Sequence, residues 1–379
     1  MGLDARFLRD DHPGVGRYVH GLASALTQLD VELVLVRQAR PAPSELRLDT
    51  SGPRLRSLVV GRSPRSPLDG PMLPRVASAA KVDVFHSPFP LGPFPFGSWR
   101  GHAPRVVTLH DLIPLRFKGN IRAPWRRPVF RRALRAALGS SRLLICPSEA
   151  TREDVEDLWP SLMGARPRPE MRVIHEAAGD VFKPSEPRRV DELRRRLGLE
   201  RPYVLWLGSR RRHKNVELLV EAWQRLGEPL RSAFQLVLAG RSGVDDAAVR
   251  SFAGAAVERG EIVGLGPVDG EDLPALYSGA ELFVLPSKAE GFGLPVVEAM
   301  ACGTAVACAA AGSLPEAAGD AARLFDPSSL DSLVACLEHL LMDGETRRDL
   351  ARRGLKRAAT LSWRKAAAEH LDAYRWAAR

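Results

Sequence analysis

Two carboxylates and two glycines lie close together in the stretch 290–301, which reads Glu-Gly-Phe-Gly-Leu-Pro-Val-Val-Glu-Ala-Met-Ala. The stretch follows an apolar run that predicts a buried parallel strand, and a helix is expected to begin within it. Because Gly291 and Gly293 carry no Cβ, the backbone N–H groups can approach an oxygen-rich ligand, and the helix dipole adds about half a positive charge. Glu290 and Glu298 can accept hydrogen bonds from hydroxyl groups. The stretch therefore predicts a site for a ligand with both phosphates and hydroxyls.

A second group of residues that could bind phosphate follows the buried strand expected over residues 203–208. The chain continues with Ser209, three consecutive arginines, a histidine and Lys214, and an amphipathic helix comes next. A strand, a glycine turn, cations and a helix N-terminus together make a diphosphate site, in which a lysine supplies a point charge and an arginine a bidentate fork. The sequence leaves open whether Arg210 or one of the next two arginines faces the phosphates.

Two further motifs fall in the first half of the chain. The glycines of Gly14-Val15-Gly16 are expected in a loop before a helix, where they can admit an anion or an acceptor group. His110 and Asp111 end the strand expected over residues 105–112, and ligands of open parallel sheets bind beyond the carboxyl ends of strands. His110 could hydrogen-bond a sugar hydroxyl or a backbone carbonyl, while Asp111 could orient the imidazole or cap the next segment of the chain. We interpret His86, at another strand end, as a supporting residue.

The motif around Glu290 resembles the donor site of retaining nucleotide-sugar glycosyltransferases of the family called group 1 or family 4. The resemblance rests on Glu-x7-Glu around Gly-Phe-Gly-Leu-Pro, which includes Phe292 and Leu294, and on the following Glu-Ala-Met-Ala-Cys-Gly-Thr-Ala-Val. Thr-Leu-His-Asp-Leu-Ile-Pro around His110, and the Gly-x-Gly-Arg-Tyr that contains Gly16, are similar to other motifs of the family. Its members have two Rossmann-like domains that face a cleft, the GT-B architecture.

The resemblance implies a role for each matched residue. It implies that His110 contacts the donor sugar, that the loop with Gly16 lies under the donor phosphates, and that the loop around Val268 lines the nucleotide base. We assign Glu290 to the hydroxyls of the donor sugar and Glu298 to the ribose.

The chain departs from the family pattern in two places. The family usually has an arginine directly after the glycine of the phosphate loop, where this chain has Ser209. It often has an Asn-Gly pair after the last strand of the first domain, where this chain has Glu176-Ala177-Ala178-Gly179. The second departure leaves the contacts of that loop undecided.

The expected reaction is transfer of a hexose from a nucleotide-diphosphate sugar to a glycan, glycolipid or small-molecule acceptor, and the resemblance implies retention of configuration. Lys214, a neighbouring arginine and the amides near Gly293 would stabilise the charge that develops on the leaving diphosphate and take the place of a metal. No cofactor is expected, and the sequence contains no Asp-x-Asp pair. GDP-mannose is the first choice of donor, because the N-terminal motifs and the Lys-Asn pair are similar to those of mannosyl- and rhamnosyltransferases.

Two alternatives come from other functional classes. A nucleotide-sugar epimerase can share this architecture and would release an isomerised nucleotide sugar without an acceptor. A non-catalytic scaffold on a membrane surface would not need an intact donor motif.

Alternating buried strands and helices in two halves predict an α/β protein with two doubly wound parallel-sheet domains. We expect the first domain over 1–183 and the second over 184–360. The segment 361–379 is expected to pack back on the first domain, as the resemblance implies. A single helix is expected from residue 346 to the end, and irregular loops over residues 40–74.

The net charge of +10 is concentrated in the first half, since residues 101–142 contain ten basic residues and one acidic residue. Within the segment 121–138, the helix expected from about residue 128 carries an apolar stripe and several arginines. Such a helix is either a core helix with a solvated basic face or a surface for an anionic membrane. Nucleic acid is not expected as a partner, because the segment has no recognition motif and no interleaved aromatic residues.

The four cysteines lie in apolar or small-residue surroundings without metal-ligand spacing. They predict core thiols in a reducing cytoplasm. No apolar run approaches the length of about 20 residues that spans a bilayer, and the N-terminus lacks a signal-peptide pattern. We therefore expect a cytoplasmic protein, with peripheral binding to the inner face of the plasma membrane as an open alternative.

Overall fold

The chain forms two compact units in the computed structural model, and each is described by itself. The structure describes residues 1–8, 13–39, 42, 46–48, 52–61, 69–90, 99, 103–117, 126–240 and 247–379. Unit 1 comprises Met1–Glu176 and Ser362–Arg379, and unit 2 comprises Ala177–Leu361. The first division falls after Glu176, a few residues before the boundary expected after residue 183.

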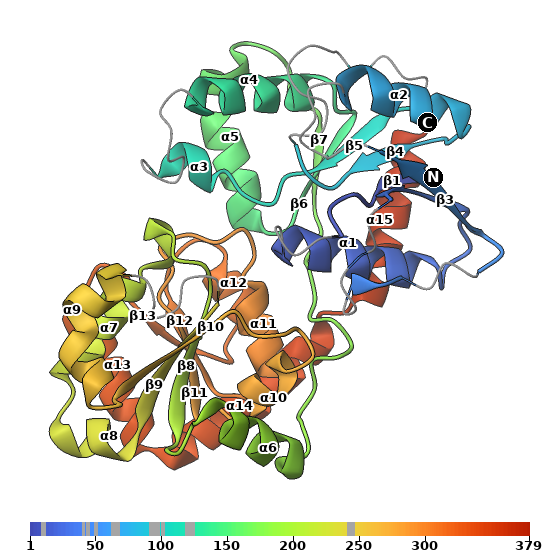
Figure 1. Ribbon diagram of the computed structural model, residues 1–379. Helices are drawn as coiled ribbons and strands as arrows, with labels where there is room; N and C mark the ends of the chain where they lie inside the picture. Colours follow the sequence, from blue (N-terminus) through green and yellow to red (C-terminus); the bar gives the residue numbers. More distant parts are fainter. Residues whose placement is uncertain are drawn as a thin grey trace. The chain divides into compact units, whose positions relative to one another are not determined.

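Unit 1 is built on a parallel seven-stranded sheet with the order β3-β2-β1-β4-β5-β6-β7 (Figure 1). Its strands are β1 (Gly2–Asp4), β2 (Leu33–Gln38), β3 (Leu55–Val60), β4 (Phe85–Ser87), β5 (Arg105–Thr108), β6 (Leu143–Cys146) and β7 (Glu170–Val173). Its helices are α1 (Pro13–Leu26), α2 (Asp69–Ala79), α3 (Ile113–Arg116), α4 (Arg126–Gly139), α5 (Glu149–Met163) and α15 (Trp363–Ala377). Strands β5 and β6 are buried at every position, as expected for parallel strands covered on both faces.

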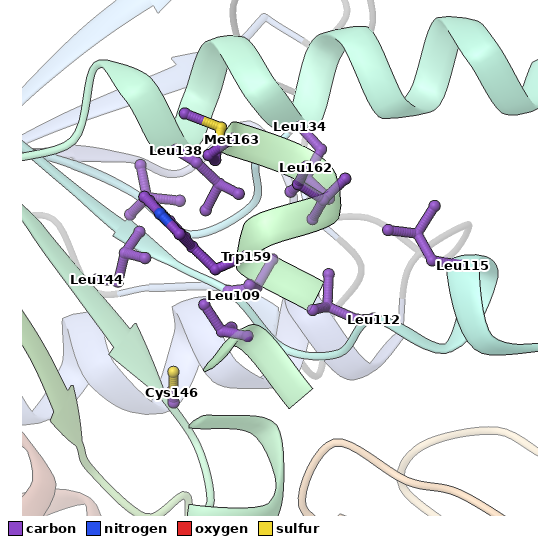
Figure 2. Close-up of a cluster of buried hydrophobic side chains, with 12 residues drawn as sticks. Leu109, Leu112, Leu115, Leu134, Leu138, Leu144, Cys146, Trp159, Leu162 and Met163 are labelled. Carbon is purple, nitrogen blue, oxygen red and sulfur yellow. The ribbon is translucent and has the colours of Figure 1, made fainter. Parts of the chain in front are cut away.

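A core cluster joins helices α4 and α5 to the sheet (Figure 2). Leu134 and Leu138 of α4 meet Trp159 and Leu162 of α5 above Leu144 of β6, and all five are almost fully buried. The apolar stripe expected for the basic helix therefore lies inside unit 1.

Helix α15 returns the end of the chain to unit 1, where it contacts α1 and β5. The single helix expected from residue 346 is wrong, because α14 ends at Thr360 and α15 begins at Trp363. Ser362 stands between them as an N-cap, and its side chain accepts from the N–H of Lys365 at 3.2 Å. The indole of Trp363 fills the space beside Gly21 of α1, since a Cβ on that glycine would lie 2.2 Å from the ring.

The irregular structure expected over residues 40–74 is also partly wrong, because β3 and the start of α2 lie there. Among the described strands β3 lies at the edge of the sheet, next to β2, and most of its residues are partly exposed. An edge strand need not be apolar on both faces, so the polar residues of β3 did not match the pattern of a buried parallel strand. Helix α2 contains Pro74 yet buries Leu73 and Ala77, so a proline inside it was misleading.

Unit 2 is built on a parallel six-stranded sheet with the order β10-β9-β8-β11-β12-β13 (Figure 1). Its strands are β8 (Tyr203–Leu207), β9 (Gln235–Ala239), β10 (Ile262–Gly266), β11 (Leu282–Leu285), β12 (Val306–Ala309) and β13 (Arg323–Phe325). Its helices are α6 (Pro187–Leu197), α7 (Val216–Arg225), α8 (Glu228–Ala233), α9 (Ala247–Glu258), α10 (Leu273–Ser278), α11 (Leu294–Ala301), α12 (Leu314–Ala318), α13 (Leu330–Met342) and α14 (Gly344–Thr360). In the part of the chain that the structure describes, no helix has the length and apolar character needed to cross a membrane.

Candidate active site

The order of the second sheet marks the place where a ligand is expected to bind. From β8 the chain builds the sheet outward through β9 and β10, and from β11 it builds in the other direction through β12 and β13. Loops that leave two such neighbouring strands diverge, and the crevice beyond their carboxyl ends is the usual ligand site of an open parallel sheet. Both stretches that the sequence predicts to bind phosphate lie in these loops, one after β8 and the other after β11.

Lys214 and Glu290 meet at this point although they are 76 residues apart in the chain. The ammonium group donates to both carboxylate oxygens, at 2.6 and 2.8 Å. The side chains are 14% and 10% exposed, so the pair is held at the protein surface without being open to bulk water on all sides. The structure thus brings together the predicted phosphate ligand and the predicted sugar ligand.

The loop after β8 holds Lys214 by backbone hydrogen bonds. Residues Arg212–Lys214 form a 3₁₀ turn, and Asn215 follows in the left-handed conformation with φ 55°. The Asn215 side chain donates to the carbonyl of Pro327 at 3.0 Å. The N–H of Lys288, in the loop after β11, donates to the carbonyl of His213 at 2.7 Å. Burial first, and the charge of Lys214 second, lower the pKa of His213 to about 4, so this imidazole is neutral at pH 7.

The loop after β11 presents Glu290 beside the N-terminus of α11. Gly293 is the N-cap with φ 106°, and a Cβ there would lie 2.8 Å from Leu314, so only glycine fits. Ser313 donates to the carbonyl of Glu290 at 3.0 Å and fixes the loop. Leu294 and Phe292 are buried beneath it. Within the described residues no side chain caps this helix, so its dipole and first N–H groups remain suited to an anion.

The three arginines that the sequence could not separate differ in burial. The side chain of Arg210 is 13% exposed and lies 3.7 Å from the carboxylate of Glu217. Arg211 and Arg212 are exposed. Of the three arginines, Arg210 is therefore the one whose side chain unit 2 holds in place. The carbonyl of Ser209, the residue before it, accepts a hydrogen bond from the N–H of Arg211 at 2.8 Å and closes a turn.

Two further predicted donor ligands are Glu298 and Val268. Glu298 is 1% exposed, and its Oε2 accepts from the hydroxyl of Tyr277 at 3.0 Å. The two glutamates of the motif thus have different partners. Val268 is half-buried just beyond β10, which is separated from β8 by β9. The roles of both residues stay predictions.

In unit 1 the motif expected as a glycine loop is helical. Helix α1 begins at Pro13, so Gly14 and Gly16 lie in its first turns, and Gly16 is buried. The expectation of a loop was wrong because glycines tolerate the start of a helix as readily as a loop. The role of Gly16 beside a phosphate stays a prediction.

His110 lies beyond the end of β5, at the carboxyl edge of the first sheet. Its Nε2 lies 2.9 Å from the carbonyl oxygen of Pro88, and its Nδ1 lies 3.0 Å from Oε1 of Glu176. The ring of Tyr18 stands edge-on to the imidazole with the centroids 4.8 Å apart. Asp111 precedes the N-cap of α3, Leu112, and its Oδ1 accepts from the N–H of Ile113 at 3.0 Å. Glu176, which the sequence reasoning missed, is thus the residue that orients His110.

A buried hydrogen-bond network holds the hydroxyl of Tyr18. The Tyr18 hydroxyl lies 2.8 Å from Thr108 and 2.7 Å from Nε2 of His370 in α15, and Thr108 in turn meets His86 at 2.7 Å. The remaining ring nitrogen of His86 meets the hydroxyl of Tyr374 at 2.7 Å. Burial lowers the pKa of His86 well below its usual range and that of His370 to about 4. His86 is therefore a neutral supporting residue of this network.

Two family models match this chain, one in each unit. Residues 13–176 match the model described as Glycosyltransferase Family 4, and residues 190–357 match the model described as Glycosyl transferases group 1. The chain belongs to the group 1, family 4 glycosyltransferases.

Similar proteins agree with this family. One relative is O-antigen chain mannosyltransferase B of Escherichia coli, which is 32% identical over 245 residues. The match covers 64% of this chain and 63% of the relative, less than two thirds of its length. A solved sucrose-phosphate synthase from Thermosynechococcus elongatus has a TM-score of 0.77 and 22% identity, with 99% of this chain and 98% of that chain covered. The Anabaena protein HepE, solved with UDP and glucose, has a TM-score of 0.72 and 19% identity, with 98% of each chain covered.

These structures show the fold, and they confirm the predicted GT-B class with two Rossmann-like parallel-sheet domains. The predicted family is confirmed as well. Among the residues that the structure describes, no three His, Cys, Asp or Glu side chains gather into a metal site.

Proposed function

We propose that this chain transfers a hexose from a nucleotide-diphosphate sugar to an acceptor hydroxyl with retention of configuration and without a metal. The observation that carries the proposal is the Lys214–Glu290 pair in the loops that follow β8 and β11. A cation and a carboxylate in contact suit a ligand that has phosphate oxygens next to sugar hydroxyls. The family supports the same reaction class.

The cationic and anionic residues would bind different parts of the donor. Lys214, Arg210 and the N-terminus of α11 would bind the diphosphate and stabilise the negative charge that it gains as the glycosidic bond breaks. Glu290 would accept from the sugar hydroxyls. Because the Lys214 ammonium contacts both oxygens of this carboxylate, it also shields the carboxylate from the diphosphate. His110 would meet the transferred sugar, as the family motif implies.

The remaining assignments rest on the motifs. Glu298 would bind the ribose, the loop at Val268 the base, and the first turn of α1 at Gly16 the phosphates. Our first choice of donor is GDP-mannose, and the name of the Escherichia coli relative, a mannosyltransferase, supports a mannosyl donor.

A donor panel tests the proposal. The protein is incubated with GDP-mannose, UDP-glucose and dTDP-rhamnose, with and without EDTA, and thermal stabilisation, donor hydrolysis and isomerisation are measured. Stabilisation and slow hydrolysis by at least one donor, unchanged by EDTA, are expected. Isomerisation without hydrolysis would favour the epimerase, and no response to any donor would contradict the transferase. Proton NMR of the anomeric centre of a transfer product decides retention.

The acceptor would be a glycan, a lipid-linked sugar or a small molecule. The Escherichia coli relative acts on an O-antigen chain by its name, which supports a glycan or lipid-linked acceptor. We place the reaction in the cytoplasm, and the four buried cysteines, none in a disulfide, support a reducing compartment.

Binding to an anionic membrane through the segment 121–138 is a further part of the proposal. Residues 121–125 lie outside the described residues, and the apolar side chains of α4 are used in the core. Arg132 and Arg135 are exposed, so contact with the membrane would be electrostatic. Each basic residue near an anionic surface contributes about 1 kcal/mol.

Sedimentation with vesicles of phosphatidylglycerol and phosphatidylcholine tests this contact. Binding at low salt, lost in about 0.5 M salt by screening, is expected. The double variant Arg132→Glu and Arg135→Glu should bind less. The control with Arg188→Glu and Arg348→Glu makes the same change of charge at exposed sites in unit 2 and should bind normally. Equal binding by both variants would refute the assignment to α4.

A further inference from the structure

Three loops of unit 1 meet at the imidazole of His110. His110 follows β5, Pro88 follows β4, and Glu176 follows β7, so all three lie at the carboxyl edge of the parallel sheet. The backbone of His110 is fixed as well, because the hydroxyl of Thr151 donates to its carbonyl at 3.2 Å. His110 is 14% exposed and Glu176 is 5% exposed at their side chains. The ring is therefore held in one orientation with one edge near the surface.

The two partners of the ring can only accept. A backbone carbonyl such as that of Pro88 has no proton to donate, and neither has an ionised carboxylate. A neutral imidazole has one N–H, so it could satisfy one of its contacts, at 2.9 Å to Pro88 or 3.0 Å to Glu176. The other contact would set two lone pairs against each other. The geometry calls for one more proton than a neutral imidazole beside a carboxylate would hold.

Tyr18 does not supply that proton. Its ring faces His110, but its hydroxyl lies 2.7 Å from Nε2 of His370 and 2.8 Å from Thr108. The other nitrogen of His370 lies 2.7 Å from the carbonyl of Ala366, so it carries the proton and Nε2 accepts. The Tyr18 hydroxyl therefore donates to His370, away from His110.

The charged and titratable groups around His110 agree with an extra proton there. Burial raises the pKa of Tyr18 and lowers that of His86 and of His370, so these neighbours are neutral. The two acids nearby are Glu176 and Asp111, the residue that follows His110 in the chain. The basic residues next to this group in the chain are Arg17 and His175, and each has an interaction partner of its own.

We propose that Glu176 is a positioning residue that keeps His110 as an imidazolium, with the Nε2 proton available to a substrate oxygen. The inference rests on the proposed function for the identity of that oxygen, which belongs to the donor sugar or its diphosphate. A substrate oxygen that replaces the Pro88 carbonyl as the acceptor of the Nε2–H accepts a charge-assisted hydrogen bond, about twice as strong as a neutral one. Glu176 stands where the family often has an Asn-Gly pair, so this departure from the family pattern would serve to position His110.

Side-chain ¹⁵N NMR of the histidine-labelled protein at pH 7.5 tests the proton count directly. His110 is identified by the signals that disappear in His110→Asn. Both ring nitrogens of the wild type should be protonated at this pH. In Glu176→Gln the ring should be neutral, because the amide accepts from Nδ1 without offsetting a charge. A neutral His110 in the wild type would overturn the proposal.

Activity gives the second readout. Glu176→Gln should lower kcat/KM about tenfold at pH 7.5, and its activity should fall at a lower pH than that of the wild type as the pH rises. Glu170→Gln, at an exposed carboxylate in β7, is the matched control and should leave both unchanged. An unaltered pH profile in Glu176→Gln would refute the positioning role. If Glu176→Gln does not fold, the NMR measurement on the wild type still decides.

The two proposals fail in different ways. If the wild type acts on no nucleotide sugar, the transferase fails while NMR still decides the protonation of His110. If it is an active transferase and His110 is neutral, only the role of Glu176 fails.

Discussion

Lys214 and Glu290 should be energetically coupled, and a double-mutant cycle measures that coupling. Lys214→Met keeps the length of the side chain and removes its charge. Glu290→Gln keeps the shape of the side chain and one acceptor oxygen. Each single variant leaves its partner without an opposite charge, whereas the double variant removes both charges at once.

The geometry sets the expected magnitude. Two hydrogen bonds of 2.6 and 2.8 Å join side chains that are 14% and 10% exposed. Removing one partner of a fully buried pair costs about 3–5 kcal/mol, and an exposed pair contributes about 1 kcal/mol or less. For this intermediate case we expect a loss of about 2 kcal/mol in the free energy of unfolding for Lys214→Met and about 1 kcal/mol for Glu290→Gln. The double variant should lose about 2 kcal/mol, which leaves a coupling of about 1 kcal/mol.

Guanidinium unfolding followed by circular dichroism measures these free energies, and turnover of the donor found in the panel is measured on the same samples. Under the proposed function, each single variant should lower kcat/KM by about 10²-fold or more, as the loss of one preorganised electrostatic contact does. The exposed pair Arg188 and Glu192 is the control for the unfolding cycle, because its side chains are 91% and 52% exposed. A cycle with Arg188→Met and Glu192→Gln should give a coupling of about 0.5 kcal/mol or less.

Additive losses in the Lys214–Glu290 cycle, within about 0.4 kcal/mol, would show that the pair does not form in solution. Coupling without a loss of activity would show instead that the pair is structural, and the reasoning about the donor site would then be refuted.

Three further predictions concern stability and reactivity. Gly21→Ala should destabilise unit 1 by about 1–3 kcal/mol, because the new Cβ would lie 2.2 Å from the ring of Trp363. Gly14→Ala in the same helix meets nothing within 4 Å and should be tolerated in thermal unfolding, so equal effects would contradict the docking of α15. Lowering the pH from about 6.5 to about 4 should cost unit 1 about 3 kcal/mol through His370, because its imidazole is buried neutral with a lowered pKa and the unfolded chain binds the proton first. His86, whose pKa burial also lowers, adds to this loss. The pH dependence of unfolding should shrink in His370→Gln, and an unchanged dependence would exclude this origin. The thiols of Cys146, Cys302, Cys308 and Cys336 should not react with a thiol reagent in the folded protein, because burial raises the pKa of each to about 12. Labelling of any one of them without unfolding would contradict this prediction.

Local patterns were enough to predict the family and the fold class. The stretch from Glu290 combines a buried strand, two glycines and a helix start, and these depend on residues next to each other in the chain. Local patterns gave wrong predictions where packing against distant parts of the chain decided the secondary structure. Gly14 and Gly16 lie in a helix because α1 packs on α15. Residues Leu55–Val60 form the strand β3 because they pair with the edge of β2.

Only the tertiary structure decided which charged side chains meet. Lys214 reaches Glu290 over 76 residues and His110 reaches Glu176 over 66, and both contacts follow from the order in which parallel strands are placed in a sheet. Parallel strands bring their carboxyl ends to one edge whatever their separation in the sequence, so loops far apart in the chain become neighbours. The sequence alone determined which residues stand at strand ends. The partner of each depends on strand order, which no local periodicity records.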